Sequence, residues 1–211
     1  MVSAEPDNAG APAARVVVLA SGTGTLAQSV VDATSDSDCP YRVVALVSDR
    51  DCEAVTRAGA AGVDTTVVAP GDHADRAAWN QALTDAVQQF EPDWVVSAGF
   101  MRILGQTFLE AFPCRVINTH PALLPSFPGA HAVRDALDYG VSVTGSTVHV
   151  VDSGVDTGPI ITQRAVDVLP DDTEATLHER IKVVERELLV DVIATAARGR
   201  LHIEGRKVYI S

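Results

Sequence analysis

The chain has 211 residues, of which 46% are hydrophobic and 21% are charged, and its formal net charge is −12. This length and composition are typical of a compact globular protein with one domain or two fused halves. The acidic balance disfavours nucleic-acid binding, because a phosphate footprint needs a surplus of Lys and Arg. No apolar run approaches the ~20 residues of a membrane-spanning helix, so we expect no membrane association.

Residues 1–14 are rich in Ala, Pro, Gly and acidic residues, which predicts a disordered N-terminal extension. The segment lacks the basic start and the long apolar run of a signal peptide. The three cysteines, Cys39, Cys52 and Cys114, are odd in number and show no CxxC spacing. This pattern disfavours a disulfide framework or a zinc site and favours a reducing, cytoplasmic location.

Strands and helices alternate through the first part of the chain. A β-branched run predicts a strand at 15–20, and a helical pattern follows at 26–34. The next predicted elements are strands at 41–48, 65–69, 94–98 and 115–118, with helices at 52–61 and 75–90. Strands that are apolar throughout and alternate with helices are typical of a parallel sheet covered on both faces. We therefore predict an α/β fold with a mostly parallel, doubly wound, Rossmann-like sheet.

The last third of the chain changes character. Long strands of mixed polarity are predicted at 142–151 and 160–168, followed by an amphipathic helix at 173–198. Asp172 or Thr173 is expected to cap this helix and Gly199 to end it. A hairpin is predicted at 201–210. These elements form a mixed C-terminal extension of the sheet, and we expect one domain over 15–211.

A glycine-rich turn, Ser21–Thr25, joins the first predicted strand to the first helix. Glycines there let backbone N–H groups approach an anion, and the helix start adds favourable partial charge. No Gly-Lys-Ser/Thr follows, and Ala27 stands at the third position of the G-x-G-x-x-G pattern. The turn therefore favours a monophosphate site over a nucleotide site, with a merely tight turn as the alternative.

Asn118 and His120 stand at the carboxyl end of a predicted strand, followed by a proline-rich loop. Side chains at i and i+2 of a strand point to the same side, so an amide donor and an imidazole face one spot. The prolines make the loop rigid and non-helical. The pair could hold a reacting carbonyl, although a capping Asn and a core His are the plain alternatives.

Asp156 lies in a turn between Gly154 and Gly158. It is either an ordinary turn residue or a carboxylate that folds back against His120 and raises the pKa of that ring. His149 and His131 are further candidates. His149 lies in a predicted strand, where packing in the core or supporting another site residue is an alternative equal to direct ligand contact. These assignments require tertiary contacts that spacing alone does not provide.

Two further segments are candidates for ligand contact. Met101, Arg102, Ile103 and Leu104 follow the fourth predicted strand and could bind a flat heterocycle, or form a plain strand-to-helix turn. Glu185 lies among basic residues of a predicted helix, where a solvated ion pair is the usual role.

Four motifs together resemble one known family: SGTGT at 21–25, AGFMRIL at 98–104, NTHPALLPSFPG at 118–129 and GSTVHVVDSGVDTGPII at 145–161. From about Val16 to Leu201 the chain resembles the phosphoribosylglycinamide formyltransferases, within the superfamily that uses 10-formyltetrahydrofolate. The resemblance implies formyl transfer from that co-substrate to the amino group of glycinamide ribonucleotide, in purine biosynthesis. It implies small-molecule substrates and no required metal, and leaves a homodimer possible. A phosphate-binding half, about 15–113, would precede a folate and catalytic half, about 114–211.

The resemblance also implies roles for individual residues. Asn118 and protonated His120 would stabilise an oxyanion, and Asp156 would keep His120 charged. Glu185 would hold the substrate amine. The phosphate cradle would be Gly24, Thr25 and Leu26, and the folate contacts Arg76, Met101, Arg102, Ile103, Leu104 and Asn118. Leu26 replaces the family's usual Asn, so a side-chain hydrogen bond is lost there.

The alternatives belong to several classes. A formyltetrahydrofolate hydrolase would carry a regulatory domain for which residues 1–14 are too short, and a methionyl-tRNA formyltransferase would carry a tRNA-binding domain. A non-catalytic phosphate- or folate-binding module would explain the turn but not the three polar residues. An NAD-dependent oxidoreductase would use Asp49 or Asp51 at the end of the second predicted strand.

Overall fold

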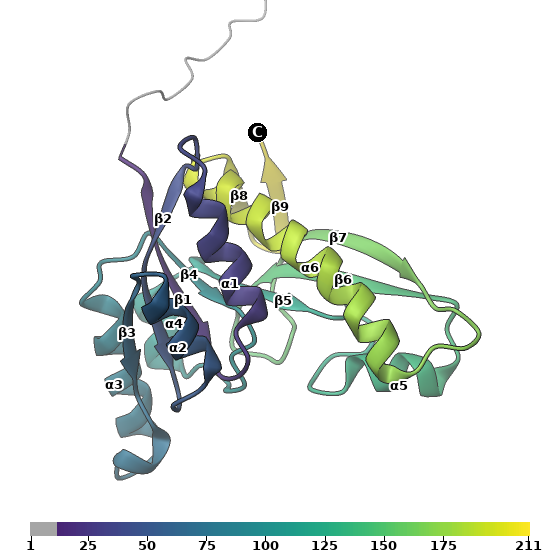
Figure 1. Ribbon diagram of the computed structural model, residues 1–211, viewed down its shortest axis with the longest axis horizontal. Helices are drawn as coiled ribbons and strands as arrows, with labels where there is room; N and C mark the ends of the chain where they lie inside the picture. Colours follow the sequence, from purple (N-terminus) through teal and green to yellow (C-terminus); the bar gives the residue numbers. More distant parts are fainter. Residues whose placement is uncertain (1–11) are drawn as a thin grey trace, which may run out of the picture.

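A computed structural model describes residues 12–211 (Figure 1). The expected extension at 1–14 lies almost entirely outside the described residues. The centre is a seven-stranded sheet with the order β3-β2-β1-β4-β5-β6-β7. Its strands are β1 Ala14–Ala20, β2 Tyr41–Ser48, β3 Asp64–Val67, β4 Trp94–Ser97, β5 Val116–His120, β6 Val143–Val150 and β7 Ile160–Asp167. Strands β1 to β5 are parallel, whereas β6 is antiparallel to both β5 and β7. The predicted mostly parallel α/β fold is confirmed.

Helices cover both faces of the sheet, as predicted. They are α1 Thr25–Asp32, α2 Glu53–Ala60, α3 Arg76–Gln88, α4 Gln106–Ala111, α5 Ala132–Tyr139 and α6 Glu174–Ala197. Two 3-10 turns occur at Ala33–Ser35 and Pro70–Asp72. Sequence patterns did not predict α4, α5 or these turns. Helix α4 and the turns are too short to show apolar periodicity, whereas α5 follows the proline-rich loop and was not separated from it.

Successive side chains of β1 point to opposite faces of the sheet and pack in two separate core clusters. Val16 and Val18 belong to a cluster with residues of α1, α2 and α6, whereas Val17 and Leu19 pack with residues of α3 and α4. All four side chains are fully buried. Successive strand residues point to opposite faces, so a strand covered on both sides must be apolar at every position. This is why β1 reads as an unbroken valine-rich run.

The C-terminal part is built largely as expected. Thr173 caps α6, because its side chain accepts a hydrogen bond from the Thr176 N–H, and Gly199 follows the helix with φ +70°. The hairpin of β8 Leu201–Glu204 and β9 Lys207–Ile210 forms a separate two-stranded sheet. Among residues 12–211, no helix combines the length and the apolar character needed to cross a bilayer.

One buried hydroxyl on β6 leads to a stability prediction. Thr144 is 1% exposed, and within the described residues its Oγ1 has no hydrogen-bond partner. An unpaired buried polar group costs about 1–3 kcal/mol, and valine has nearly the same shape. We expect Thr144→Val to raise the free energy of unfolding by about 1 kcal/mol, measured by urea denaturation.

A matched control lies in α3. Thr84 is equally buried, but its Oγ1 donates to the Asn80 carbonyl oxygen at 2.7 Å. Thr84→Val removes a satisfied hydrogen bond and should not stabilise the protein. Equal effects from the two substitutions would contradict the explanation.

Candidate active site

The candidate site lies at the carboxyl edge of the parallel strands. Strands β1 and β4 are neighbours in the sheet but are not consecutive in the chain, so the connections diverge between them. Ligands of open α/β sheets bind at such a point. Here the glycine-rich turn after β1 meets the segment after β4: the Ser21 N–H donates to the Gly99 carbonyl oxygen at 3.1 Å, and the Met101 N–H donates to Ser21 Oγ at 2.9 Å.

Asn118 and His120 extend from the same face of β5, as the i, i+2 spacing predicts. The strand continues through His120, two residues beyond the predicted end. The antiparallel pairing places His149 of β6 directly opposite Asn118, and the Asn118 amide nitrogen lies 3.2 Å from His149 Nε2. His149 Nδ1 donates to the Val150 carbonyl oxygen at 3.0 Å. The amide and the two rings therefore form one polar cluster.

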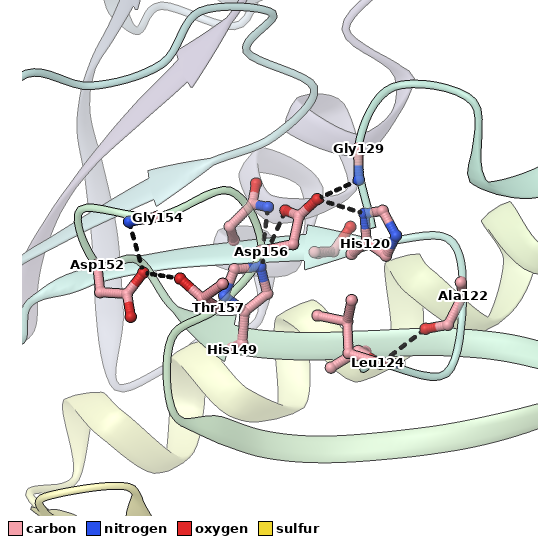
Figure 2. A network of polar contacts seen from close by, with 12 residues as sticks. His120, Ala122, Leu124, Gly129, His149, Asp152, Gly154, Asp156 and Thr157 are labelled. Atoms are coloured by element: carbon pink, nitrogen blue, oxygen red, sulfur yellow. Dashed lines mark hydrogen bonds and ion pairs between the residues drawn. The ribbon is translucent and has the colours of Figure 1, made fainter. Parts of the chain in front are cut away.

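Asp156 folds back into this cluster from the loop between β6 and β7. Its Oδ2 lies 3.3 Å from His120 Nδ1 and accepts a hydrogen bond from the Gly129 N–H at 2.8 Å (Figure 2). Its Oδ1 lies 3.6 Å from His149 Nε2. The expected contact between Asp156 and His120 is therefore present. The His149 ring, then the Gly129 N–H and the charge of His120, hold the pKa of Asp156 below its usual range against the effect of burial.

His149 Nε2 faces both the Asn118 amide and Asp156 Oδ1. A neutral ring accepts a hydrogen bond at Nε2 from the Asn118 amide, whereas a charged ring donates a hydrogen bond to Asp156. The protonation state of His149 therefore decides which of the two it pairs with. The Asn118 amide has two N–H donors, so one remains available to a ligand in either case.

The expected direction of the His120 pKa shift is wrong. The ring is 4% exposed, and burial lowers its pKa by more than the Phe127 carbonyl and Asp156 raise it. His120 Nε2 donates to that carbonyl oxygen at 2.7 Å, and Nδ1 faces Asp156. Both ring nitrogens thus have acceptors for the charged form, but desolvation favours the neutral form. Sequence spacing contains no information about the burial that decides the sign.

The role of Asp156 can be measured on the His120 ring. Asp156→Asn removes the negative charge, so protonation of His120 becomes harder and its pKa should fall further below the usual range. An NMR titration of the imidazole resonances measures this change. Asp135→Asn, at an exposed carboxylate of α5, is the control and should leave the His120 pKa unchanged. A constant or higher pKa in Asp156→Asn would contradict the assignment.

The loop that presents Asp156 has a tightly defined conformation. Asp156 has φ +54°, in the left-handed region. Asp152 Oδ1 accepts hydrogen bonds from the Gly154 N–H at 3.0 Å and from Thr157 Oγ1 at 2.6 Å (Figure 2). A Cβ at Gly158 would lie 1.7 Å from the Val150 carbonyl oxygen. The flanking glycines are therefore required by close packing within the loop.

The C-terminal hairpin supports this loop from outside. Arg206, at the turn between β8 and β9, donates from its guanidinium to the Thr157 carbonyl oxygen at 2.8 Å. Sequence reasoning missed Arg206, because no local pattern connects a hairpin turn to a loop far away in the chain.

The glycine-rich turn has an open helix start. Gly24 has φ +72° and precedes α1 without a side-chain cap. A Cβ on Gly24 would approach the Ala54 Cα to 2.6 Å, so only glycine fits there. The first backbone N–H groups of α1 therefore remain available to an anion. Leu26, in the first turn of α1, packs against the core cluster, which accounts for an apolar residue at this position.

A pocket of about 490 Å³ lies beside the segment after β4. It is lined by Pro70, Asp75, Arg76, Trp79, Met101, Arg102 and Ile103. Arg76 donates to the Ile103 carbonyl oxygen at 3.3 Å, and the Met101 side chain is 73% exposed at the rim. Arg76 and residues 101–104 were predicted to contact the folate, and four of these five side chains line this pocket. Leu104 is instead buried in the core beneath α3 and α4.

Asp49 follows directly after β2 and is fully buried. Arg102 Nε lies 2.7 Å from Asp49 Oδ2, and Arg50 binds the same carboxylate. Burial opposes ionisation, but hydrogen bonds from Arg50, Arg102 and Ser21 lower the pKa of Asp49 to about 2. Because the carboxylate is already paired, it is poorly placed to bind a cofactor ribose, which counts against the oxidoreductase alternative.

The sequence profile described as Formyl transferase matches residues 14–193. The chain belongs to this family. The phosphoribosylglycinamide formyltransferase of Mycobacterium tuberculosis (strain H37Rv) is 57% identical over 203 residues, 93% of this chain and 94% of that protein. The phosphoribosylglycinamide formyltransferase of Bacillus subtilis (strain 168) is 36% identical over 180 residues, 85% of this chain and 92% of that protein. The crystal structure of glycinamide ribonucleotide transformylase 1 from Symbiobacterium toebii gives a TM-score of 0.91 at 45% identity, covering 93% of each chain.

The resemblance inferred from the motifs is thereby confirmed for the formyl transferase family. Two of the predicted site residues nevertheless lie apart from the Asn118–His120–Asp156 cluster. His131 is exposed at the start of α5. Glu185 is only 6% exposed, so the solvated ion pair favoured by its local sequence is wrong. Within residues 12–211, no group of three or more His, Cys, Asp or Glu residues is arranged to hold a metal ion.

Glu185 lies on the opposite face of β5 from His120. Thr119 points away from its neighbours Asn118 and His120, and its Oγ1 donates to Glu185 Oε1 at 2.7 Å. Burial raises the pKa of Glu185, and the Thr119 hydrogen bond offsets part of this rise. A ligand that contacts both Glu185 and His120 must therefore reach around the end of β5.

Proposed function

We propose that this formyltransferase transfers the formyl group of 10-formyltetrahydrofolate to the amino group of glycinamide ribonucleotide. We place this reaction in cytoplasmic purine biosynthesis. The observation that carries the proposal is the convergence of Asn118, His120 and Asp156 at the carboxyl edge of the sheet that also bears the glycine-rich turn and the pocket after β4. The names of the two relatives and of the crystal structure support the same substrate.

The glycine-rich turn is the proposed phosphate site. The backbone N–H groups of Gly24, Thr25 and Leu26 would donate to the phosphate oxygens, helped by the partial positive charge of the α1 start. This mode of binding depends on the backbone, so it tolerates leucine at position 26. The buried carboxylate of Glu185 would accept hydrogen bonds from the substrate, and we assign its partner as the amino group.

The pocket beside the segment after β4 is the proposed folate site. Met101 and Ile103 supply apolar surface for a flat heterocycle, and Arg76 supplies a cation for the carboxylates of the folate glutamate. The pocket volume of about 490 Å³ lies in the range of small-molecule sites. These residues precede residue 114, so the proposed folate site draws mainly on the first half of the sequence, with Asn118 as its contribution from the second half.

The chemistry follows from the polar cluster. The substrate amine attacks the formyl carbon, and the carbonyl oxygen becomes an oxyanion. The Asn118 amide and the His120 ring would donate hydrogen bonds to it, with the oxyanion competing with the Phe127 carbonyl for the Nε2 proton. Asp156 stabilises the charged ring as this happens. A proton leaves the attacking amine and reaches the departing folate nitrogen, relayed by a water that Asp156 orients.

The test is a turnover assay with purified protein and 10-formyltetrahydrofolate. Formylated glycinamide ribonucleotide and tetrahydrofolate should form together, only when glycinamide ribonucleotide is present. Formate release without that acceptor would indicate a hydrolase. Binding of both compounds without turnover would indicate a non-catalytic module, and either outcome would overturn the proposal.

A further inference from the structure

We propose that Thr119 is a positioning residue, whose hydroxyl orients the Glu185 carboxylate toward the bound nucleotide substrate. The inference rests on the proposed function, because it assigns Glu185 a ligand. It concerns a side chain within the 118–129 motif that has no role assigned so far and that lies on the other face of β5 from the polar cluster.

The contact is short and lies in an apolar setting. Thr119 Oγ1 is 2.7 Å from Glu185 Oε1, and Glu185 is 6% exposed. Val148 of β6 pairs with Thr119, and Leu188 and Leu189 follow Glu185 by one turn of α6; all three are buried and apolar. The charges that act on the carboxylate, Lys182 and Arg186, belong to α6 itself.

A carboxylate has about four acceptor sites on two oxygens. The Thr119 hydroxyl engages one oxygen, Oε1, and so fixes the carboxylate plane while leaving Oε2 to a ligand. Oε2 has no hydrogen-bond partner among the described residues and is not fully enclosed, so it can accept a hydrogen bond from a donor outside the protein. An ammonium or hydroxyl group of the substrate supplies such a donor.

Position 119 has no packing reason to be polar. It is the fourth of the five residues of β5 and pairs with Val148 of β6, and a valine or isoleucine would suit the strand equally well there. Threonine has a branched Cβ with restricted χ1, so its hydroxyl is held in a narrow range of directions. The three residues 118–120 thus serve both faces of one strand, with Asn118 and His120 on one side and Thr119 on the other.

The experiment compares Thr119→Val, Thr119→Ser, Glu185→Gln and the double variant Thr119→Val with Glu185→Gln. Calorimetry measures the Kd for glycinamide ribonucleotide, and steady-state kinetics measure KM and kcat. We expect Thr119→Val to raise Kd and KM by about 10-fold or more, because a hydrogen bond to a charged group is lost. The change in kcat should be much smaller. Thr119→Ser should restore most of the affinity, and Thr119→Val should have little further effect in the Glu185→Gln background.

Thr195→Val on the same helix is the control, because its exposed hydroxyl only donates to the Asp191 carbonyl oxygen. Wild-type affinity in Thr119→Val, alongside weakened affinity in Glu185→Gln, would overturn the inference and leave the proposed function intact. Additive losses in the double variant, or no rescue by serine, would also overturn it. Failure of the wild-type protein to formylate glycinamide ribonucleotide would show instead that the proposed function is wrong.

Discussion

Replacing Asn118 or His120 by alanine is expected to lower kcat by about 10²–10³-fold, while the protein stays folded. Each side chain is a proposed donor to the oxyanion, and losing one such donor typically has an effect of this size. Affinity for both substrates should change much less, because the oxyanion exists only in the transition state. Steady-state kinetics with glycinamide ribonucleotide and 10-formyltetrahydrofolate measure the change.

His202→Ala is the control for this pair. His202 is an exposed residue of β8, where its ring contacts the Ser211 hydroxyl rather than the polar cluster. Its removal should leave kcat near the wild-type value. Near-normal turnover in both Asn118→Ala and His120→Ala would show that the cluster does not carry the chemistry.

Gly158→Ala is expected to disable the loop that presents Asp156. The added Cβ would lie 1.7 Å from the Val150 carbonyl oxygen and 3.4 Å from the Asp152 nitrogen, so the backbone must move. Such overpacking usually lowers stability by about 1–3 kcal/mol. A shift of about 1 Å in a catalytic group lowers the rate by roughly 10²-fold. Turnover and urea denaturation should therefore both show losses.

The matched control is Gly59→Ala in α2, where an added Cβ meets no atom within 4 Å. Alanine is favoured over glycine in a helix interior, so this variant should gain about 0.5–1 kcal/mol and retain activity. Wild-type turnover in Gly158→Ala would show that the loop tolerates displacement and that Asp156 needs no fixed position.

The parallel sheet was predictable because burial on both faces leaves a strong mark on the sequence. Strands such as β1 must be apolar at every position, and the helices between them are long enough to show a period. The six-residue helix α4 is too short for such a signal. The antiparallel direction of β6 was not assigned either, since direction depends on how a connection crosses the sheet.

The candidate site was predictable where it depends on one strand or one turn. The spacing of Asn118 and His120 places both on one face, and the family resemblance supplied Asp156. The Thr119–Glu185 contact and the lowered pKa of His120 depend on packing between distant elements. Charge and spacing near Glu185 indicated a solvated residue, whereas α6 in fact turns this side chain into the core.

The contact between Arg206 and the Thr157 carbonyl oxygen has a consequence for the order of assembly during translation. The two residues are 49 positions apart, and the ribosome adds roughly 5–20 residues per second. Residue 157 therefore leaves the ribosome seconds before its partner does. In that interval the nascent chain lacks the Arg206 contact, so the Asp156 segment gains this hydrogen bond only after the hairpin has emerged.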